Sequence, residues 1–143
     1  NVLYTLDAPS FTFNGVGPGA QSSVLLDAFK RFRGILFLHT PSTTEKERIF
    51  KKSKANVDIT GVDVHVASND ESLSLETDAS YNLTITSPTI SIHANTVYGA
   101  LYGLESVSQL VDRGTFINGT TITDSPRYQF RSTMIDTARI TIP

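Results

Sequence analysis

The spacing of apolar residues predicts two helices. Between residues 22 and 38, apolar side chains recur at steps of three and four while charged ones fall on the opposite side, as in an amphipathic helix. The same spacing returns between 95 and 111, where Asn95 or Thr96 can serve as the N-cap. The stripe expected to face the core in the first helix consists of Val24, Leu25, Ala28, Phe29, Phe32, Ile35 and Leu36.

Alternation of apolar and polar residues predicts the strands. Asn118-Gly119 is a turn pair typical of a two-residue hairpin, which here would join 116–117 to 121–122. Because the alternating pieces are short and separated by turn residues, they predict a meander of antiparallel strands with one face buried. The remaining alternating pieces lie at 4–6, 11–13, 57–66, 73–75, 81–85 and 90–92.

Three segments interrupt this pattern. Residues 15–19 (GVGPG) are expected to break any regular structure. Residues 40–55 are polar and charged, which indicates a loop. Ser132–Thr137 predicts a new strand that stops almost as soon as it starts. Since a strand needs a neighbour, we expect the natural protein to continue beyond it.

Composition narrows the class of protein. The 143 residues suit one ordinary domain, and Thr and Ser together favour a β-rich or α+β fold. Twelve basic against fourteen acidic residues argue against a nucleic-acid binder. The absence of cysteine excludes disulfides, a thiolate nucleophile and a Cys-based zinc site. No apolar stretch is long enough to span a membrane. Because the first residue is Asn, any signal peptide would already be gone.

Most candidate motifs for chemistry have a simpler interpretation. The Gly15-x-Gly17-x-x-Ala20 spacing resembles a dinucleotide fingerprint, but the polar segment after the helix leaves no βαβ unit, so a glycine-rich turn is expected. The three histidines lack a zinc-type spacing, and His65 and His93 are expected to point outward from their strands as surface side chains. We therefore expect neither a metal site nor a cofactor.

Two further motifs have structural readings. Gly99-x-x-x-Gly103 lies on the second predicted helix, where two glycines one turn apart would let a sheet or a neighbouring domain approach closely. Asn82-Leu83-Thr84 and Asn118-Gly119-Thr120 are N-glycosylation sequons, although two matches are close to the number expected by chance in this composition. Asn82 and Asn118 are thus the candidate glycosylation sites.

Two segments resemble a known family. Residues 95–111 (NTVYGALYGLESVSQLV) resemble the Gly-Ala-x-x-Gly-Leu-Glu-Thr-x-x-Gln-Leu helix of the β-N-acetylhexosaminidases of glycoside hydrolase family 20. Residues 124–131 (DSPRYQFR) and 134–139 (MIDTAR) resemble the Asp-x-Pro-Arg-Phe-x-x-Arg-Gly and Asp-Thr-Ser-Arg run of the same family. The motifs have the family's order and spacing, and they cover about a third of the chain.

The resemblance implies an architecture, and it implies that this chain is the non-catalytic N-terminal domain of an enzyme that removes terminal N-acetylglucosamine or N-acetylgalactosamine by substrate-assisted retaining hydrolysis. It implies an α+β accessory domain at 1–125, an antiparallel sheet with helices packed on one face, followed at 126–143 by a linker and the first strand of a (β/α)8 catalytic barrel. The expected partners are that barrel, through it terminal N-acetylhexosamine sugars, and a second copy of the full-length enzyme. The implied location is lysosomal or secreted. The family's catalytic Asp-Glu pair would lie downstream, so no catalytic residue is expected in this chain.

Only one substrate-binding residue carries over. Arg139 matches the arginine that follows the first barrel strand and holds hydroxyls of the terminal sugar, a role that suits the fixed fork of guanidinium donors. The chain departs from the family at Ser132, where Gly is usual, and at Ile140-Thr141, beside Arg139. Two alternatives stay open: an accessory domain of another barrel glycosidase, and a stand-alone structural or carbohydrate-binding module.

Overall fold

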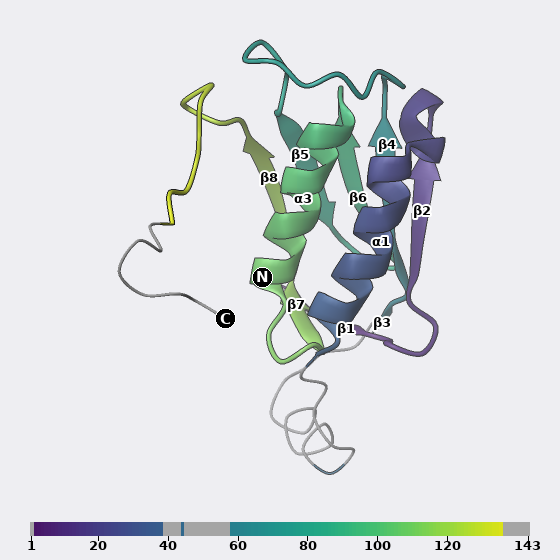
Figure 1. The fold of residues 1–143 in the computed structure, drawn as a ribbon. Coiled ribbons are helices and arrows are strands. Elements are labelled where there is room, and N and C mark those ends of the chain that lie inside the picture. The colour runs from purple at the N-terminus through teal and green to yellow at the C-terminus, as the bar shows by residue number, and fades with distance from the viewer. Residues whose placement is uncertain (1, 39–43, 45–57, 136–143) are drawn as a thin grey trace.

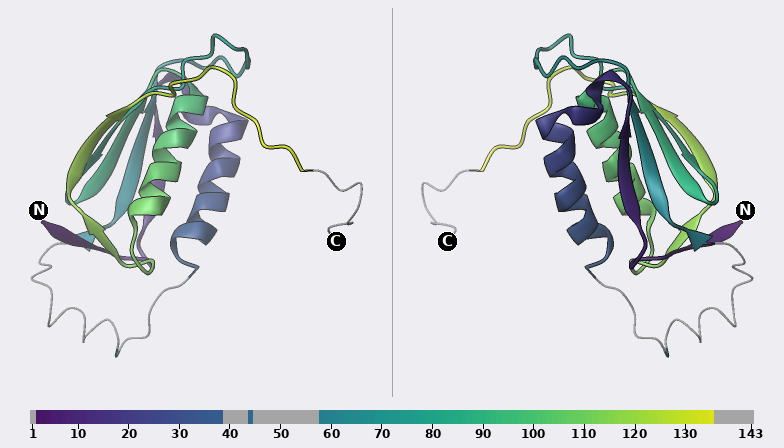
Figure 2. Two further views of the ribbon diagram at one scale, coloured as in Figure 1. Left: turned by 90° about the vertical axis from the view of Figure 1, so that its left-hand side faces the viewer. Right: turned by 90° about the vertical axis from the view of Figure 1, so that its right-hand side faces the viewer.

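The computed structural model describes residues 2–38, 44 and 58–135, and its main feature is one sheet covered by two helices on a single face. Helices α1 (Ser23–Leu36) and α3 (Val97–Leu110) lie side by side on that face (Figures 1 and 2). In spatial order the five strands are β2 (Thr12–Val16), β4 (Gly61–Val66), β6 (Thr89–Ala94), β5 (Tyr81–Ile85) and β8 (Thr120–Asp124). The α+β class and the one-sided helix layer are as predicted.

A smaller sheet closes one end of the domain. Its strands, in spatial order, are β3 (Asp58–Ile59), β1 (Leu3–Leu6) and β7 (Phe116–Asn118). The short 3-10 helix η1 (Pro18–Gln21) leads from β2 into α1. The prediction that regular structure breaks at residue 15 is wrong, because strand β2 runs through Gly15 and Val16. The irregular backbone is confined to Gly17, which has a φ of +90°.

Both helices begin within the ranges that the sequence indicated, the second at Thr96, one of its two predicted N-caps. The Ser22 hydroxyl accepts a hydrogen bond from the Leu25 amide at 3.3 Å, and the Thr96 hydroxyl accepts one from the Gly99 amide at 3.2 Å. The apolar stripe of α1 is buried except near its edges, where Ile35 is 47% exposed. Because successive helix positions differ by about 100°, Ile35 lies at the border of the stripe while Leu36 faces the sheet.

The strand directions differ from the predicted meander. Strands β2, β4 and β6 are mutually parallel, and only β5 is antiparallel to its neighbours β6 and β8. The sheet is mixed because α1 returns the chain between β2 and β4, and because β5 lies on the far side of β6, so that β6 pairs with β4 in the parallel direction. Alternation reports which face of a strand is buried, but it carries no information about direction.

Two further predictions of local structure are wrong. Leu73 and Leu75 were expected in a strand, but they are 71% and 59% exposed in an irregular segment. Side-chain bonds hold this segment locally, such as the Ser72 amide donating to Asp70 at 2.8 Å, and these compete with sheet pairing.

The Asn118-Gly119 hairpin is the second error. Strand β7 pairs with β1 in the small sheet, whereas β8 pairs with β5 in the large one. The Gly119 amide donates to the Val2 carbonyl at 2.7 Å, so the chain passes from one sheet into the other instead of folding back. Residues 40–55, expected to form a loop, lie outside the described residues except for Thr44.

Candidate functional site

The helix motif at 95–111 packs tightly on the sheet. A methyl group added to Gly99 would come within 2.4 Å of the Ser80 carbonyl oxygen, and one added to Gly103 within 2.6 Å of Ile92. The predicted close approach is therefore confirmed, and the surface that approaches is the sheet of the same domain. These glycines fix the distance at which α3 lies over β5 and β6.

The beginning of the second motif is tied to the same helix. The Tyr81 hydroxyl lies 2.5 Å from that of Ser106 on α3, and it donates to the carboxylate of Asp124 at 3.4 Å. Asp124 is the last residue of β8 and the first of the DSPRYQFR segment. Tyr81 thus joins the motif helix to the point where the chain leaves the sheet.

The segment after β8 returns along the outer side of α3. Arg131 donates through Nη2 to the Tyr102 hydroxyl at 2.7 Å and through Nη1 to the Tyr128 carbonyl at 2.6 Å. Its guanidinium carbon lies 5.0 Å from the centre of the Tyr102 ring. Arg131 was part of a quoted motif, but this contact was not foreseen, because nothing in the sequence pairs it with Tyr102.

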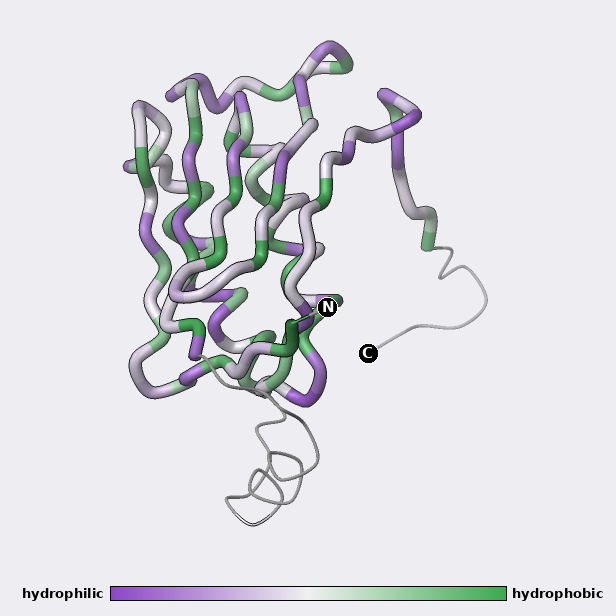
Figure 3. Tube along the Cα trace, turned by 180° about the vertical axis from the view of Figure 1, so that it is seen from behind, coloured by the Kyte–Doolittle hydropathy of each residue, from purple (hydrophilic) through white to green (hydrophobic). Residues whose placement is uncertain are grey.

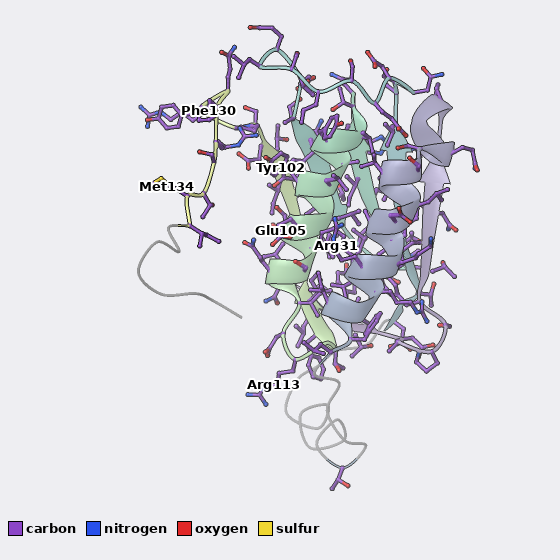
Figure 4. The ribbon with its side chains drawn as sticks, in the orientation of Figure 1. Arg31, Tyr102, Glu105, Arg113, Phe130 and Met134 are labelled. Carbon is purple, nitrogen blue, oxygen red and sulfur yellow. The ribbon has the colours of Figure 1, made fainter. Side chains whose placement is uncertain are left out.

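Apolar side chains of this segment stand in solvent. Phe130 is 73% and Met134 89% exposed, and both project from the segment without covering the domain (Figure 4). Leu26 of α1 and Tyr102 of α3 add exposed apolar surface on the helices. Exposed large apolar side chains that lie near one another are typical of a contact surface.

The predicted substrate residue lies outside the described part of the chain, as do positions 140 and 141 beside it; Arg139 therefore remains a prediction. Residues 132–135, expected to begin a strand, are exposed and carry no strand assignment. No described strand lies beside them to provide ladder hydrogen bonds, and such bonds are what define a strand.

Both sequons are accessible. Asn82 is exposed on β5, facing away from the helices, and its amide oxygen accepts a hydrogen bond from Thr123 at 2.7 Å. Asn118 is exposed at the end of β7. Exposure is necessary for a glycan, and its presence stays a prediction.

The open face of the sheet carries a pair of histidines. Figure 3 shows this face, on which hydrophilic and hydrophobic positions alternate along the strands. His65 and His93 point outward as predicted, and they are register partners on β4 and β6 whose rings stack at 4.2 Å. A hollow of about 290 Å³ lies beside them. Partial burial, and then the neighbouring His65, lower the pKa of His93.

The described residues hold little else that could do chemistry. They contain no group of three or more His, Asp or Glu side chains close enough to hold a metal ion. None of the helices among them is long and apolar enough to cross a membrane. The C-terminal segment and the histidine pair are therefore the features that a function must explain.

Comparison with known proteins identifies relatives of the whole chain. Residues 1–110 match the family model described as "beta-acetyl hexosaminidase like". Beta-hexosaminidase subunit alpha of Rattus norvegicus is 39% identical over 151 residues, covering 98% of this chain and 28% of that protein. Beta-hexosaminidase subunit beta of Homo sapiens is 36% identical over 135 residues, covering 87% and 23%. The chain thus spans about a quarter of the length of these relatives.

Solved structures share the fold. The chitobiase of Flavobacterium johnsoniae superposes with a TM-score of 0.67 at 24% identity, over 100% of this chain and 21% of that one. The N-acetyl-beta-hexosaminidase of Streptomyces plicatus superposes with a TM-score of 0.52 at 14% identity, over 89% and 24%. Together with the family match, the two-helix sheet and its tightly seated motif helix show that this chain belongs to the family of β-acetyl hexosaminidase-like domains, the N-terminal domains of glycoside hydrolase family 20 hexosaminidases.

Proposed function

We propose that this chain is the non-catalytic accessory domain of a β-N-acetylhexosaminidase that removes terminal N-acetylglucosamine or N-acetylgalactosamine from glycans. The observation that carries the proposal is the combination of a family match over residues 1–110 with coverage of only 28% of a hexosaminidase subunit. The remaining three quarters of such an enzyme provide room for a catalytic barrel, which a (β/α)8 fold of about 250 residues requires.

The proposed chemistry belongs to that barrel. In substrate-assisted retaining hydrolysis, the acetamido oxygen of the sugar attacks the anomeric carbon while a glutamic acid protonates the leaving oxygen. An aspartate orients the acetamido group. This chain would contribute Arg139, whose guanidinium would hold two neighbouring hydroxyls of the terminal sugar.

The accessory role rests on the exposed apolar surface. Phe130 and Met134 lie in the segment that leads toward Arg139, and both side chains project away from the domain (Figure 4). A barrel that continues from this segment would cover them and remove their apolar area from water, at about 25 cal/mol per Å². The proposed location is lysosomal or secreted, which agrees with two exposed sequons.

The test compares this chain with a longer polypeptide that includes the barrel. We expect hydrolysis of an aryl N-acetyl-β-glucosaminide by the longer protein and none by the 143-residue chain. Turnover by the purified chain would contradict the accessory role. Activity of the longer protein on an aryl β-glucuronide instead would assign the domain to another class of glycosidase.

A matched pair of substitutions tests the docking surface. Phe130→Ser should lower the Tm of the longer protein and leave that of the isolated chain unchanged, because Phe130 is exposed in the latter. Val16→Ser on β2, at the sheet edge away from this segment, is the control and should not distinguish the two proteins. An equal response of both proteins to Phe130→Ser would show that the barrel does not cover this residue.

A further inference from the structure

Two histidines share one position on the open sheet face. His65 on β4 and His93 on β6 are directly opposite each other, and their rings are parallel to within 5° with centroids 4.2 Å apart. Since β4 and β6 are neighbouring strands of the large sheet, the backbone holds the two side chains side by side. Flexible loops play no part in this arrangement.

Both rings are available to bind. Among the described residues, neither imidazole has a hydrogen-bond partner, and the two rings stack on each other. A neutral imidazole with a free nitrogen lone pair is the form that binds metal ions.

The surroundings leave room for a hydrated ion. The hollow of about 290 Å³ beside the rings is also lined by Asn82 and Asn95. The nearest acidic residue along β4 is Asp63, two positions from His65 on the same face, where it accepts a hydrogen bond from Asn14 at 2.9 Å. Strands β2 and β5, which flank the pair, carry no acidic residue.

We propose that His65 and His93 together bind one divalent transition-metal ion, with water completing its coordination. Imidazole nitrogens suit zinc, copper and nickel. Two such nitrogens bound to one tetrahedral zinc ion at about 2.0–2.1 Å stand roughly 3.3 Å apart. The rings are stacked in parallel, so their in-plane lone pairs point the same way, and both side chains must rotate about their χ torsions to direct two nitrogens at one ion. The backbone of β4 and β6 need not move, because the two residues are already register partners. The site is separate from sugar hydrolysis and does not depend on the proposed function.

Zinc chloride is the probe, titrated calorimetrically into the EDTA-treated and dialysed chain at pH 7.5. We expect one saturable site per chain. Two ligands on one rigid scaffold gain roughly 10²–10⁴ in affinity over one. His65→Gln and His93→Gln should therefore each weaken binding by about 100-fold, and the double variant should be hardly weaker than either. His39→Gln, which removes the third histidine of the chain, is the control and should leave the affinity unchanged.

A second measurement on the unsubstituted chain guards against misfolded variants. In NMR spectra, the ring protons of His65 and His93 should shift together at one equivalent of zinc at pH 7.5. At pH 5 the shifts should disappear, because protons displace the metal. The proposal is overturned by an absence of saturable binding, by undiminished affinity in either single variant, or by ring shifts in His39 alone.

Discussion

Arg131 bridges two groups at once, the Tyr102 hydroxyl on α3 at 2.7 Å and the Tyr128 carbonyl of its own segment at 2.6 Å. Its guanidinium also lies over the Tyr102 ring at 5.0 Å. The planar fork of an arginine can make these contacts together, whereas a lysine presents a single point charge. The bridge holds the C-terminal segment against the helix that carries the other family motif.

Arg131→Lys should therefore free this segment without unfolding the domain. We expect faster hydrogen exchange in residues 125–131 and a change of less than about 1 kcal/mol in the free energy of unfolding, as for exposed cation–π contacts. Arg127→Lys is the matched control, because Arg127 lies over the ring of its neighbour Tyr128 and makes no such bridge to α3. Unchanged exchange in Arg131→Lys would show that the bridge does not hold the segment.

Two helical glycines should respond to alanine in opposite directions. Gly99→Ala would place a methyl group 2.4 Å from the Ser80 carbonyl oxygen, so we expect a loss of about 1–3 kcal/mol in the free energy of unfolding. Gly34 of α1 has open space around it, and Gly34→Ala should gain up to about 1 kcal/mol. Urea unfolding measures both. Stabilisation by both substitutions would mean that α3 can move away from the sheet at little cost.

The stability of the metal-free chain should fall as the pH drops below about 6.5. The pKa of His93 is lower in the folded state than in the unfolded chain, so between the two values the unfolded chain holds more protons. Lowering the pH through that window favours unfolding. With EDTA present, urea unfolding at pH 7.5 and 5.0 should show a smaller difference for His93→Gln than for the unsubstituted chain. An equal difference would remove His93 as a source of the effect.

Glycosylation should occur at both sequons when the protein is secreted from a eukaryotic cell. Asn82 and Asn118 are exposed, so the enzyme that transfers the glycan can reach both of them in the unfolded and in the folded chain. Thr84→Ala and Thr120→Ala remove one sequon each while keeping the asparagine, and each should lower the mass by one glycan. Removal of N-glycans by enzyme should abolish the difference. An unchanged mass in either variant would show that its asparagine is not used.

The sequence predicted buried faces far better than strand directions. Val64 and Ile92 are fully buried and His65 and His93 face outward, as alternation requires. The parallel pairing of β2, β4 and β6 could not be predicted this way, because it depends on the crossover through α1 and on the position of β5 outside β6 in the sheet. The strand predicted at Leu73 is absent for a related reason. Alternation over three residues does not outweigh local turns made by Asp and Ser.

The candidate sites likewise contain features that the sequence predicted and contacts that it could not predict. The Gly99 and Gly103 spacing led to the correct inference of close packing, because a glycine in a helix is costly unless something needs the space. The contacts of Arg131 with Tyr102 and of His65 with His93 join residues 29 and 28 positions apart in the chain. Such contacts depend on the register of the strands and on the course that the C-terminal segment takes over the domain. Patterns in a single sequence carry no information about either.

Arg139→Lys in the longer, barrel-containing protein is the most direct test of the proposed substrate contact. The substitution keeps the charge but removes the fork that would hold two sugar hydroxyls. If those bonds strengthen as the sugar ring flattens in the transition state, the loss appears in kcat as well as in KM. We expect a loss of about 2–4 kcal/mol in kcat/KM, as for a charged hydrogen-bond partner removed from a closed site.

Arg131→Lys is the matched control, since Arg131 binds Tyr102 and should affect kcat/KM far less. Thermal unfolding should barely change in the Arg139→Lys enzyme. Full activity would refute the substrate contact, and a large fall in Tm with unchanged kcat would instead make Arg139 a structural residue.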